Sequence, residues 1–190
     1  MCYEFDEEGW SPNIRAVPSP HFNERPEGEK ISLIVVHGIS LPAGSFGGEY
    51  VKALFTDCLD CSRKEFEDLK GLHVSSHFFI RRDGEIIQFV SCDKRAWHAG
   101  VSFFNGRTNC NDFSIGIELE GTDYVPYEEV QYSVLAELID SLCQVYPIEA
   151  LRGHSDIAPG RKTDPGPYFD WKKLHNLLNE SKLLDKTSTI

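Results

Sequence analysis

The chain has 190 residues, of which 41% are hydrophobic and 12% aromatic, proportions typical of a folded globular protein with one substantial core. Its formal net charge of −11 excludes the basic surface that a nucleic-acid-binding protein needs. No apolar run approaches the roughly 20 residues of a membrane span, so we expect neither nucleic acid nor a membrane as a partner.

The N-terminal sequence MCYEFDEEGWSP is acidic and lacks the basic and apolar regions of a signal peptide. We therefore expect a cytoplasmic protein whose six cysteines, which follow no framework spacing, are free thiols. Residues 1–30 contain four prolines and predict an irregular arm. Residues 184–190 are expected to form a loose tail on a single domain that spans residues 1–190.

The first predicted strand is ISLIVVH, residues 31–37, a nearly continuous apolar run that indicates burial on both faces and ends in His37. A Gly- and Pro-rich loop follows, and then a mixed segment through Lys70 that is expected to hold one or two helices. Residues 74–90 form a predicted hairpin, because Asp83-Gly84 is a turn signal between two β-rich runs.

A further strand is predicted for FSIGIELEG, residues 113–121. Its alternation places four residues on one face, namely Ser114, Gly116, Glu118 and Glu120.

Helical spacing then predicts a helix from residue 126 to about 146, with a stripe formed by Val130, Val134, Leu138 and Leu142. A last helix is predicted for residues 170–183, with Asp170 as its N-cap. Strands interleaved with helices indicate a mixed α/β or α+β sheet with helices packed on it.

The stretch GHSDIAPGRKTDPGP, residues 153–167, contains three glycines and three prolines and predicts a shaped loop rather than a helix or a central strand. His154 and Asp164 offer two of the three protein ligands that a catalytic zinc needs. Lys162 stands two residues before Asp164, where a cation suits an oxyanion that forms beside the metal. The alternative is a proline-rich surface loop that contains these residues without a metal.

The third ligand is expected from a rigid element that ends at the same sheet edge, and His37 fits best. It could instead cap the strand and bond to backbone. His77 and His98 compete for the same role. His77 lies inside a strand, where a core histidine is the simpler interpretation, whereas His98 lies in an aromatic loop and could line a cleft.

A water on such a metal needs a general base within hydrogen-bonding reach. Glu118 and Glu120 are the candidates, because burying a glutamate on an apolar strand is costly without a reason. Periodicity does not choose between them, and one of the pair could only bind Arg81, Arg82 or a backbone amide.

Five motifs carry a resemblance to a known family: VVHGISLPAGSFGG, RRDG, RAWHAGVS, CNDFSIGIELEGTD and GHSDIAPGRKTDPGP. In this order they are similar to the cytosolic AmpD-type N-acetylmuramoyl-L-alanine amidases, which recycle the cell wall of Gram-negative bacteria. The resemblance spans residues 10–171. It implies an α/β fold with a central mixed β-sheet flanked by helices, a single catalytic zinc, and anhydromuropeptides as the small-molecule substrate of a monomeric enzyme.

The resemblance also implies roles for individual residues. The zinc ligands fall on His37, His154 and Asp164, the general base on Glu118 and the oxyanion-stabilising residue on Lys162. Trp97 would wall the substrate cleft, and His98 is expected to lie beside it.

The sequence departs from the family pattern at three positions. Gly38 stands where the family usually has Asn, and His73 and Asn109 stand where arginines are expected. These departures bear on how the substrate is gripped, not on the metal or the base.

The function implied is hydrolysis of the amide bond between the lactyl group of muramic acid and L-alanine. Zinc polarises the carbonyl, Glu118 moves the proton, and Lys162 holds the oxyanion with the metal. One alternative is a non-catalytic muropeptide-binding protein of the same fold. A remote one is a non-haem Fe(II) oxygenase, since His154 and Asp156 form an HxD pair, but its second histidine would have to be the distant His175.

Overall fold

The computed structural model describes residues 2–180 and has a six-stranded sheet at its centre, in the order β1-β5-β4-β9-β3-β10. Neighbouring strands pair in parallel except β4 and β5, which are antiparallel, so the predicted mixed sheet is confirmed. The strands are β1 (Arg15–Ala16), β3 (Leu33–Ile39), β4 (Phe78–Ile80), β5 (Ile86–Gln88), β9 (Ser114–Glu120) and β10 (Ala150–Gly153).

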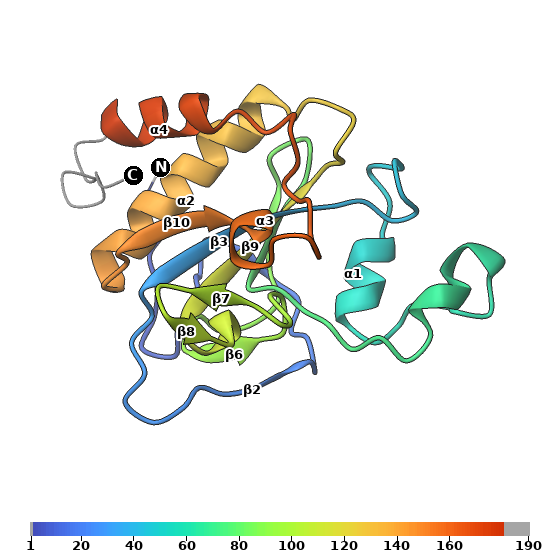
Figure 1. Ribbon diagram of the computed structural model, residues 1–190, viewed down its shortest axis with the longest axis horizontal. Helices are drawn as coiled ribbons and strands as arrows, with labels where there is room; N and C mark the ends of the chain where they lie inside the picture. The colour runs from blue at the N-terminus through green and yellow to red at the C-terminus, as the bar shows by residue number, and fades with distance from the viewer. Residues whose placement is uncertain (1, 181–190) are drawn as a thin grey trace.

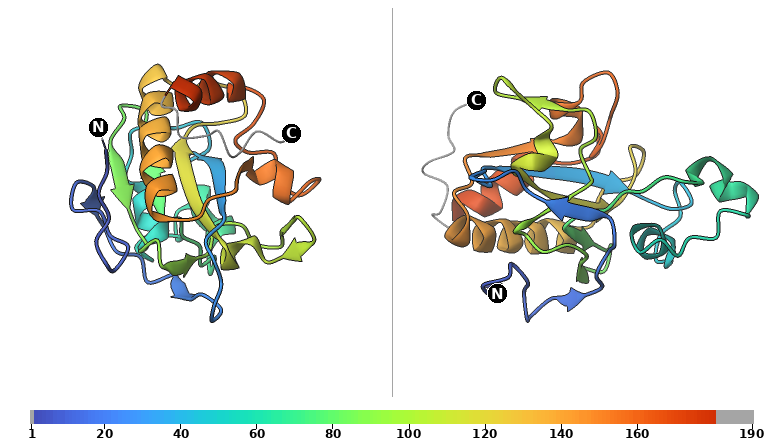
Figure 2. Two further views of the ribbon diagram at one scale, coloured as in Figure 1. Left: turned by 90° about the vertical axis from the view of Figure 1, so that its left-hand side faces the viewer. Right: turned by 90° about the horizontal axis from the view of Figure 1, so that it is seen from below.

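Two small antiparallel pairs accompany the sheet, β2 (Phe22–Glu24) with β6 (Lys94–Ala96) and β7 (Phe103–Phe104) with β8 (Arg107–Thr108). The α-helices are α1 (Tyr50–Phe55), α2 (Glu129–Val145), α3 (His154–Ile157) and α4 (Trp171–Glu180). Two 3₁₀ helices complete the described elements, η1 (Lys64–Leu69) and η2 (Cys110–Asp112). The segment that carries α1 and η1 projects beyond one end of the sheet (Figures 1 and 2).

Helices α2 and α4 lie side by side and cover one face of the sheet (Figure 1). Their apolar side chains form the main core with β3, β4 and β9, and fully buried members include Ile34, Ile117, Leu138 and Leu174. On the other face, alternate residues of the same strands, which include Leu33, Val35 and Phe79, belong to two smaller buried apolar clusters. The side chains of His37 on β3 and Glu118 on β9 point to that side as well.

Several sequence predictions need correction. The first long strand continues past His37 to Ile39, so the histidine lies inside β3 rather than at its end. His154 begins the single-turn helix α3, where a loop was predicted. Val130 is 40% exposed and lies outside the core face of α2, because the buried stripe runs instead through Leu135, Leu138 and Leu142.

Other predictions are confirmed. Gly84 takes a φ of 89° in the turn between β4 and β5, a conformation that glycine adopts without strain. The Asp170 carboxylate accepts a hydrogen bond from the Lys173 backbone N–H and so caps α4. The predicted end of this helix at residue 183 and the tail at 184–190 lie outside the described residues.

The predicted irregular arm, residues 1–30, is not irregular throughout, since it contributes β1 and β2. All six cysteines are free thiols, as expected. Within residues 2–180, no helix is both long enough and apolar enough to cross a membrane.

His77 is fully buried beside the guanidinium of Arg25, which donates hydrogen bonds to backbone carbonyls that include those of Cys92 and Ser114. The Gly116 backbone N–H donates to His77 Nδ1 at 3.0 Å, so the ring proton lies on Nε2 and is donated to the Lys94 carbonyl. His77 is thus a neutral core histidine and not a metal ligand. Burial, reinforced by the Arg25 charge, lowers the pKa of His77 to about 3.

We expect this histidine to make the protein sensitive to acid. Its folded pKa of about 3 lies below the ordinary 6.5, so the unfolded chain binds the proton more readily and stability is lost as the pH falls from 6.5 toward 3. At about pH 5, the titration of His77 alone should lower the free energy of unfolding by about 2 kcal/mol. Urea unfolding of the metal-free protein at about pH 7.5 and pH 5 measures this decrease.

His77→Gln removes the titrating group, so its free energy of unfolding is expected to fall less between the two pH values than that of the wild type. His175→Gln, a change at an exposed histidine, is the matched control and keeps the wild-type pH dependence. If the free energy of unfolding fell by the same amount between the two pH values in His77→Gln and in the wild type, this account would be contradicted.

Candidate metal site and cleft

The register of the parallel strands brings the first two site residues together. His37 on β3 is the direct partner of Glu118 on β9, so both side chains leave the sheet on the same face. His154 follows the last residue of β10, the neighbour of β3 on its other side. Because parallel strands point their carboxyl ends to one edge, these side chains meet where such sheets usually bind ligands.

The structure brings His37, His154 and Asp164 together within metal-binding distance. The Nδ1 atoms of the two histidines lie 3.0 Å apart. Asp164 Oδ2 lies 3.1 Å from the Nδ1 of His154 and 3.3 Å from the Nδ1 of His37. Both histidines are buried, whereas the Asp164 side chain remains 17% exposed.

A chain of hydrogen bonds fixes the tautomer of His37. Ser114 Oγ donates to the Cys110 carbonyl, which can only accept, and so the hydroxyl accepts from Nε2–H of His98. Nδ1 of the neutral His98 ring then accepts from Nε2–H of His37 at 2.9 Å. Burial lowers the pKa of His98 well below its ordinary value and that of His37 to about 4, so both rings are neutral. Nδ1 of His37 therefore carries no proton and presents its lone pair.

His154 is oriented through its other nitrogen. Its Nε2 lies 3.1 Å from the Ala99 carbonyl oxygen, which requires a proton on that nitrogen and turns Nδ1 toward His37 and Asp164. Two imidazole nitrogens and the Asp164 carboxylate thus face one another, and this donor set matches that of a catalytic zinc.

Glu118 and Glu120 differ in how their oxygens are used. The Glu120 carboxylate accepts hydrogen bonds from the backbone N–H groups of Gly47 and Arg82, so both of its oxygens are engaged. Glu118 Oε1 lies 3.9 Å from His37 Nδ1, and its buried Oε2 has no hydrogen-bond partner among the described residues. Burial and then the Asp164 carboxylate raise the pKa of Glu118 well above its ordinary value, which Lys162 offsets in part.

A cleft of about 520 Å³ opens over these groups. Six of the predicted site residues line it, namely Trp97, His98, Glu118, His154, Lys162 and Asp164. Trp97 is held by a hydrogen bond from its Nε1 to Asn23 Oδ1 at 2.7 Å, and the Lys162 side chain is exposed. Of the departures from the family pattern, Gly38 and His73 line the cleft, while Asn109 precedes η2 and is not part of the lining.

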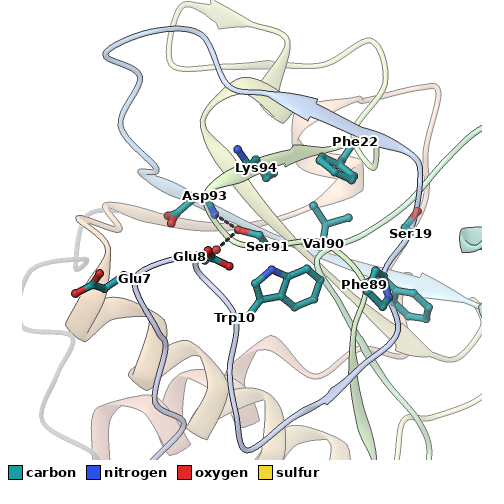
Figure 3. A pocket seen from close by; sticks show the side chains of 11 residues that line it. Glu7, Glu8, Trp10, Ser19, Phe22, Phe89, Val90, Ser91, Asp93 and Lys94 are labelled. Atoms are coloured by element: carbon teal, nitrogen blue, oxygen red, sulfur yellow. Dashed lines mark hydrogen bonds between the residues drawn. The ribbon is translucent and has the colours of Figure 1, made fainter.

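A second hollow lies under the N-terminal arm, walled by Trp10, Phe22 and Phe89 (Figure 3). The Ser91 hydroxyl donates to the Glu8 carbonyl and accepts from the Asp93 N–H, which ties the arm down there. Its lining includes carboxylates but no histidine, so the set of two histidines and an aspartate belongs to the first cleft.

Several residues that the sequence did not single out support the site. The Arg161 guanidinium donates to the carbonyls of Ala99 and Val101 and so fixes the loop that orients His154. Gly116 lets the His98 ring lie against β9, because a Cβ at this position would fall 2.5 Å from His98 Cγ. Ser114 shares the face of Glu118, so strand alternation could have identified it.

Asp156 has a local role. Its Oδ2 accepts a hydrogen bond from the Gly153 backbone N–H at 2.7 Å, which stabilises the first turn of α3. Neither Asp156 nor His175 belongs to a metal-capable group within residues 2–180, so the iron oxygenase alternative gains no support.

Comparisons with known proteins agree with this geometry. A family model described as N-acetylmuramoyl-L-alanine amidase matches residues 27–167. The 1,6-anhydro-N-acetylmuramyl-L-alanine amidase AmpD of Enterobacter cloacae is 54% identical over 178 residues, covering 92% of this chain and 95% of that protein.

Two solved structures extend the comparison. The crystal structure of a selenomethionine derivative of AmpD has a TM-score of 0.89 at 54% identity, covering 92% of this chain and 99% of that chain. AmpDh3 from Pseudomonas aeruginosa, in complex with an anhydromuramic pentapeptide, has a TM-score of 0.58 at 31% identity, covering 80% of this chain and 61% of that chain.

The packing of Gly116 yields a test of the hydrogen-bond chain. Gly116→Ala would push the His98 ring away from β9 and break its bond to His37, and we expect zinc affinity to fall about 10–100-fold. Gly48→Ala is the control, because a Cβ there meets only ordinary contacts. Competition with a chromophoric chelator measures both. If Gly116→Ala bound zinc as tightly as the wild type, the hydrogen bond between His98 and His37 would not be what orients His37 for the metal.

Proposed function

This chain belongs to the N-acetylmuramoyl-L-alanine amidase family, and from that membership we propose that it hydrolyses the amide bond between 1,6-anhydro-N-acetylmuramic acid and L-alanine. The substrates are peptidoglycan turnover fragments, and the reaction serves cell-wall recycling. The names of the relatives support this substrate, since AmpD of E. cloacae is a 1,6-anhydro-N-acetylmuramyl-L-alanine amidase and AmpDh3 was solved with an anhydromuramic pentapeptide.

One observation supports hydrolysis over binding alone. The ligand-type atoms of His37, His154 and Asp164 meet beside Glu118, whose buried Oε2 has no partner among the described residues. A buried polar atom without a partner typically costs about 1–3 kcal/mol. A protein that only binds muropeptides has no use for such a carboxylate, whereas a hydrolase uses it to move a proton.

We assign zinc to this site, held by Nδ1 of His37, Nδ1 of His154 and the Asp164 carboxylate. Zinc there supplies Lewis acidity to the scissile carbonyl and lowers the pKa of a water. Two hydrogen bonds orient the histidine ligands. His98 accepts from Nε2–H of His37, and the Ala99 carbonyl accepts from Nε2–H of His154, so each Nδ1 is turned toward the metal position.

Glu118 is the general base in this proposal. It takes a proton from the attacking water and later returns it to the nitrogen of the departing L-alanine. Burial raises the pKa of Glu118, which favours taking up the proton of the water and holding it until the amine departs.

Lys162 lines the same cleft two residues from Asp164 and donates hydrogen bonds to the oxyanion of the tetrahedral intermediate. Removing one such donor typically costs about 10²–10³ in rate.

We expect activity to depend on the metal reversibly. Protein as purified should contain zinc and release peptide from an anhydromuropeptide. Treatment with EDTA should abolish release, and added zinc should restore it, with chromatography of the products as the readout. Protein that binds the muropeptide but never releases peptide, with or without zinc, would instead be the non-catalytic binder.

A substitution at the proposed base separates metal binding from proton transfer. Glu118→Gln keeps the size of the side chain, so we expect wild-type zinc content with turnover lower by about 10²–10⁴-fold. Glu67→Gln, at an exposed glutamate of η1, is the matched control and should remain active. Turnover near that of the wild type in Glu118→Gln would assign the base to another group.

A further inference from the structure

A second group of ligand-type side chains lies at the cleft wall. His21, Asp57 and His73 each offer one atom, and these atoms all lie within 4.8 Å of one another. Asp57 Oδ1 is central, 3.5 Å from His21 Nε2 and 3.6 Å from His73 Nδ1. None of the three belongs to the group formed by His37, His154 and Asp164.

His21 points an unsatisfied nitrogen into this group. Its side chain is only 7% exposed, and its buried Nε2 makes no hydrogen bond with any described residue. The ring stacks on Trp97 at a centroid distance of 5.8 Å, which limits where the nitrogen can turn. A buried polar atom left unpaired in a native fold calls for a partner, and an ion is one such partner.

Two buried serines hold the surrounding backbone. The Ser19 hydroxyl accepts from the His21 backbone N–H and donates to the Phe55 carbonyl, two residues before Asp57. Ser75 stands two residues after His73. Its hydroxyl donates to the His21 carbonyl and accepts from the Trp97 N–H. All three ligand-bearing segments are therefore tied together by hydrogen bonds next to the ligands themselves.

The distances suit a transition metal. With metal–ligand bonds of about 2.0–2.2 Å, the corners of a tetrahedron lie roughly 3.3–3.6 Å apart. The two contacts of Asp57 already approach this value. The side chains of Asp57 and His73 are more than half exposed, so small rotations can bring the third pair of atoms closer.

We propose that His21, Asp57 and His73 form a second metal site, which binds zinc through two imidazoles and one carboxylate and leaves one position to water. Imidazole and carboxylate together favour zinc over hard cations such as calcium or magnesium, whose ligands are oxygens.

The site would fasten the wall of the cleft. His21 precedes β2, Asp57 follows α1, and His73 precedes β4, so one ion would join three distant parts of the sequence. The segment between Asp57 and His73 carries η1, projects from the sheet and contributes Leu69, Leu72 and His73 to the cleft (Figure 1). Zinc at this position would hold that wall in place.

Zinc stoichiometry of the full chain tests the proposal. Metal-free protein is dialysed against buffered zinc, and zinc per chain is measured by mass spectrometry for the wild type, Asp57→Asn and His73→Gln. The wild type should bind two equivalents and each variant one, because a site that already has only three protein ligands would be left with two. His175→Gln, at an exposed histidine outside both groups, should still bind two.

Hydrogen exchange supplies a second readout that is independent of activity. The second equivalent of zinc should slow exchange in residues 57–73 of the wild type and leave exchange in Asp57→Asn unchanged. A wild-type value of one equivalent would overturn the proposal, as would two equivalents retained in both variants. Asp164→Asn reports on the first site separately, so loss of the catalytic metal and loss of this one remain distinguishable.

Discussion

The close approach of two histidine nitrogens is the constraint on which this protein depends. Nδ1 of His37 and Nδ1 of His154 lie 3.0 Å apart with Asp164 Oδ2 beside both, and His37 carries its proton on the far nitrogen, Nε2. A cation among these three atoms would be bound by all of them. The surrounding structure, from the Ser114 hydroxyl to the Ala99 carbonyl, serves to keep the two protons where they are.

The sheet is what brings these groups to one place. Parallel pairing of β9, β3 and β10 sends three carboxyl ends to one edge, while α2 and α4 bury the opposite face. Both glutamates of β9 lie on one face, and their neighbours give them different roles. Glu120 accepts hydrogen bonds from backbone N–H groups of neighbouring loops with both oxygens, whereas Glu118 has one oxygen without a partner among the described residues, near His37.

The cleft wall is held by both apolar and polar contacts. The segment with α1 and η1 extends beyond the sheet, and α1 packs through Val51, Leu54 and Phe55 on a smaller apolar cluster. Hydroxyl groups of Ser19 and Ser75 tie the backbone on either side of this segment. A second ion at His21, Asp57 and His73 would fit this scheme, because it would add a cross-link at the same place.

The sequence by itself determined the elements and the candidate groups. Strand alternation placed Glu118 and Glu120 on one face, turn chemistry located the hairpin at Gly84, and apolar spacing found α2 and α4. These features are local, and nearby residues decide them. The resemblance of five motifs added the family and the ligand set of His37, His154 and Asp164.

Only the tertiary structure decided what depends on long-range contact. It showed that His77 is a core histidine bonded to Gly116 and that Glu120 is fully engaged. It also brought His21 and Asp57 beside His73, far apart in the sequence. Periodicity carries no information on which distant backbone group a side chain will meet, so tautomers, unpaired atoms and the second cluster could be read only from the folded chain.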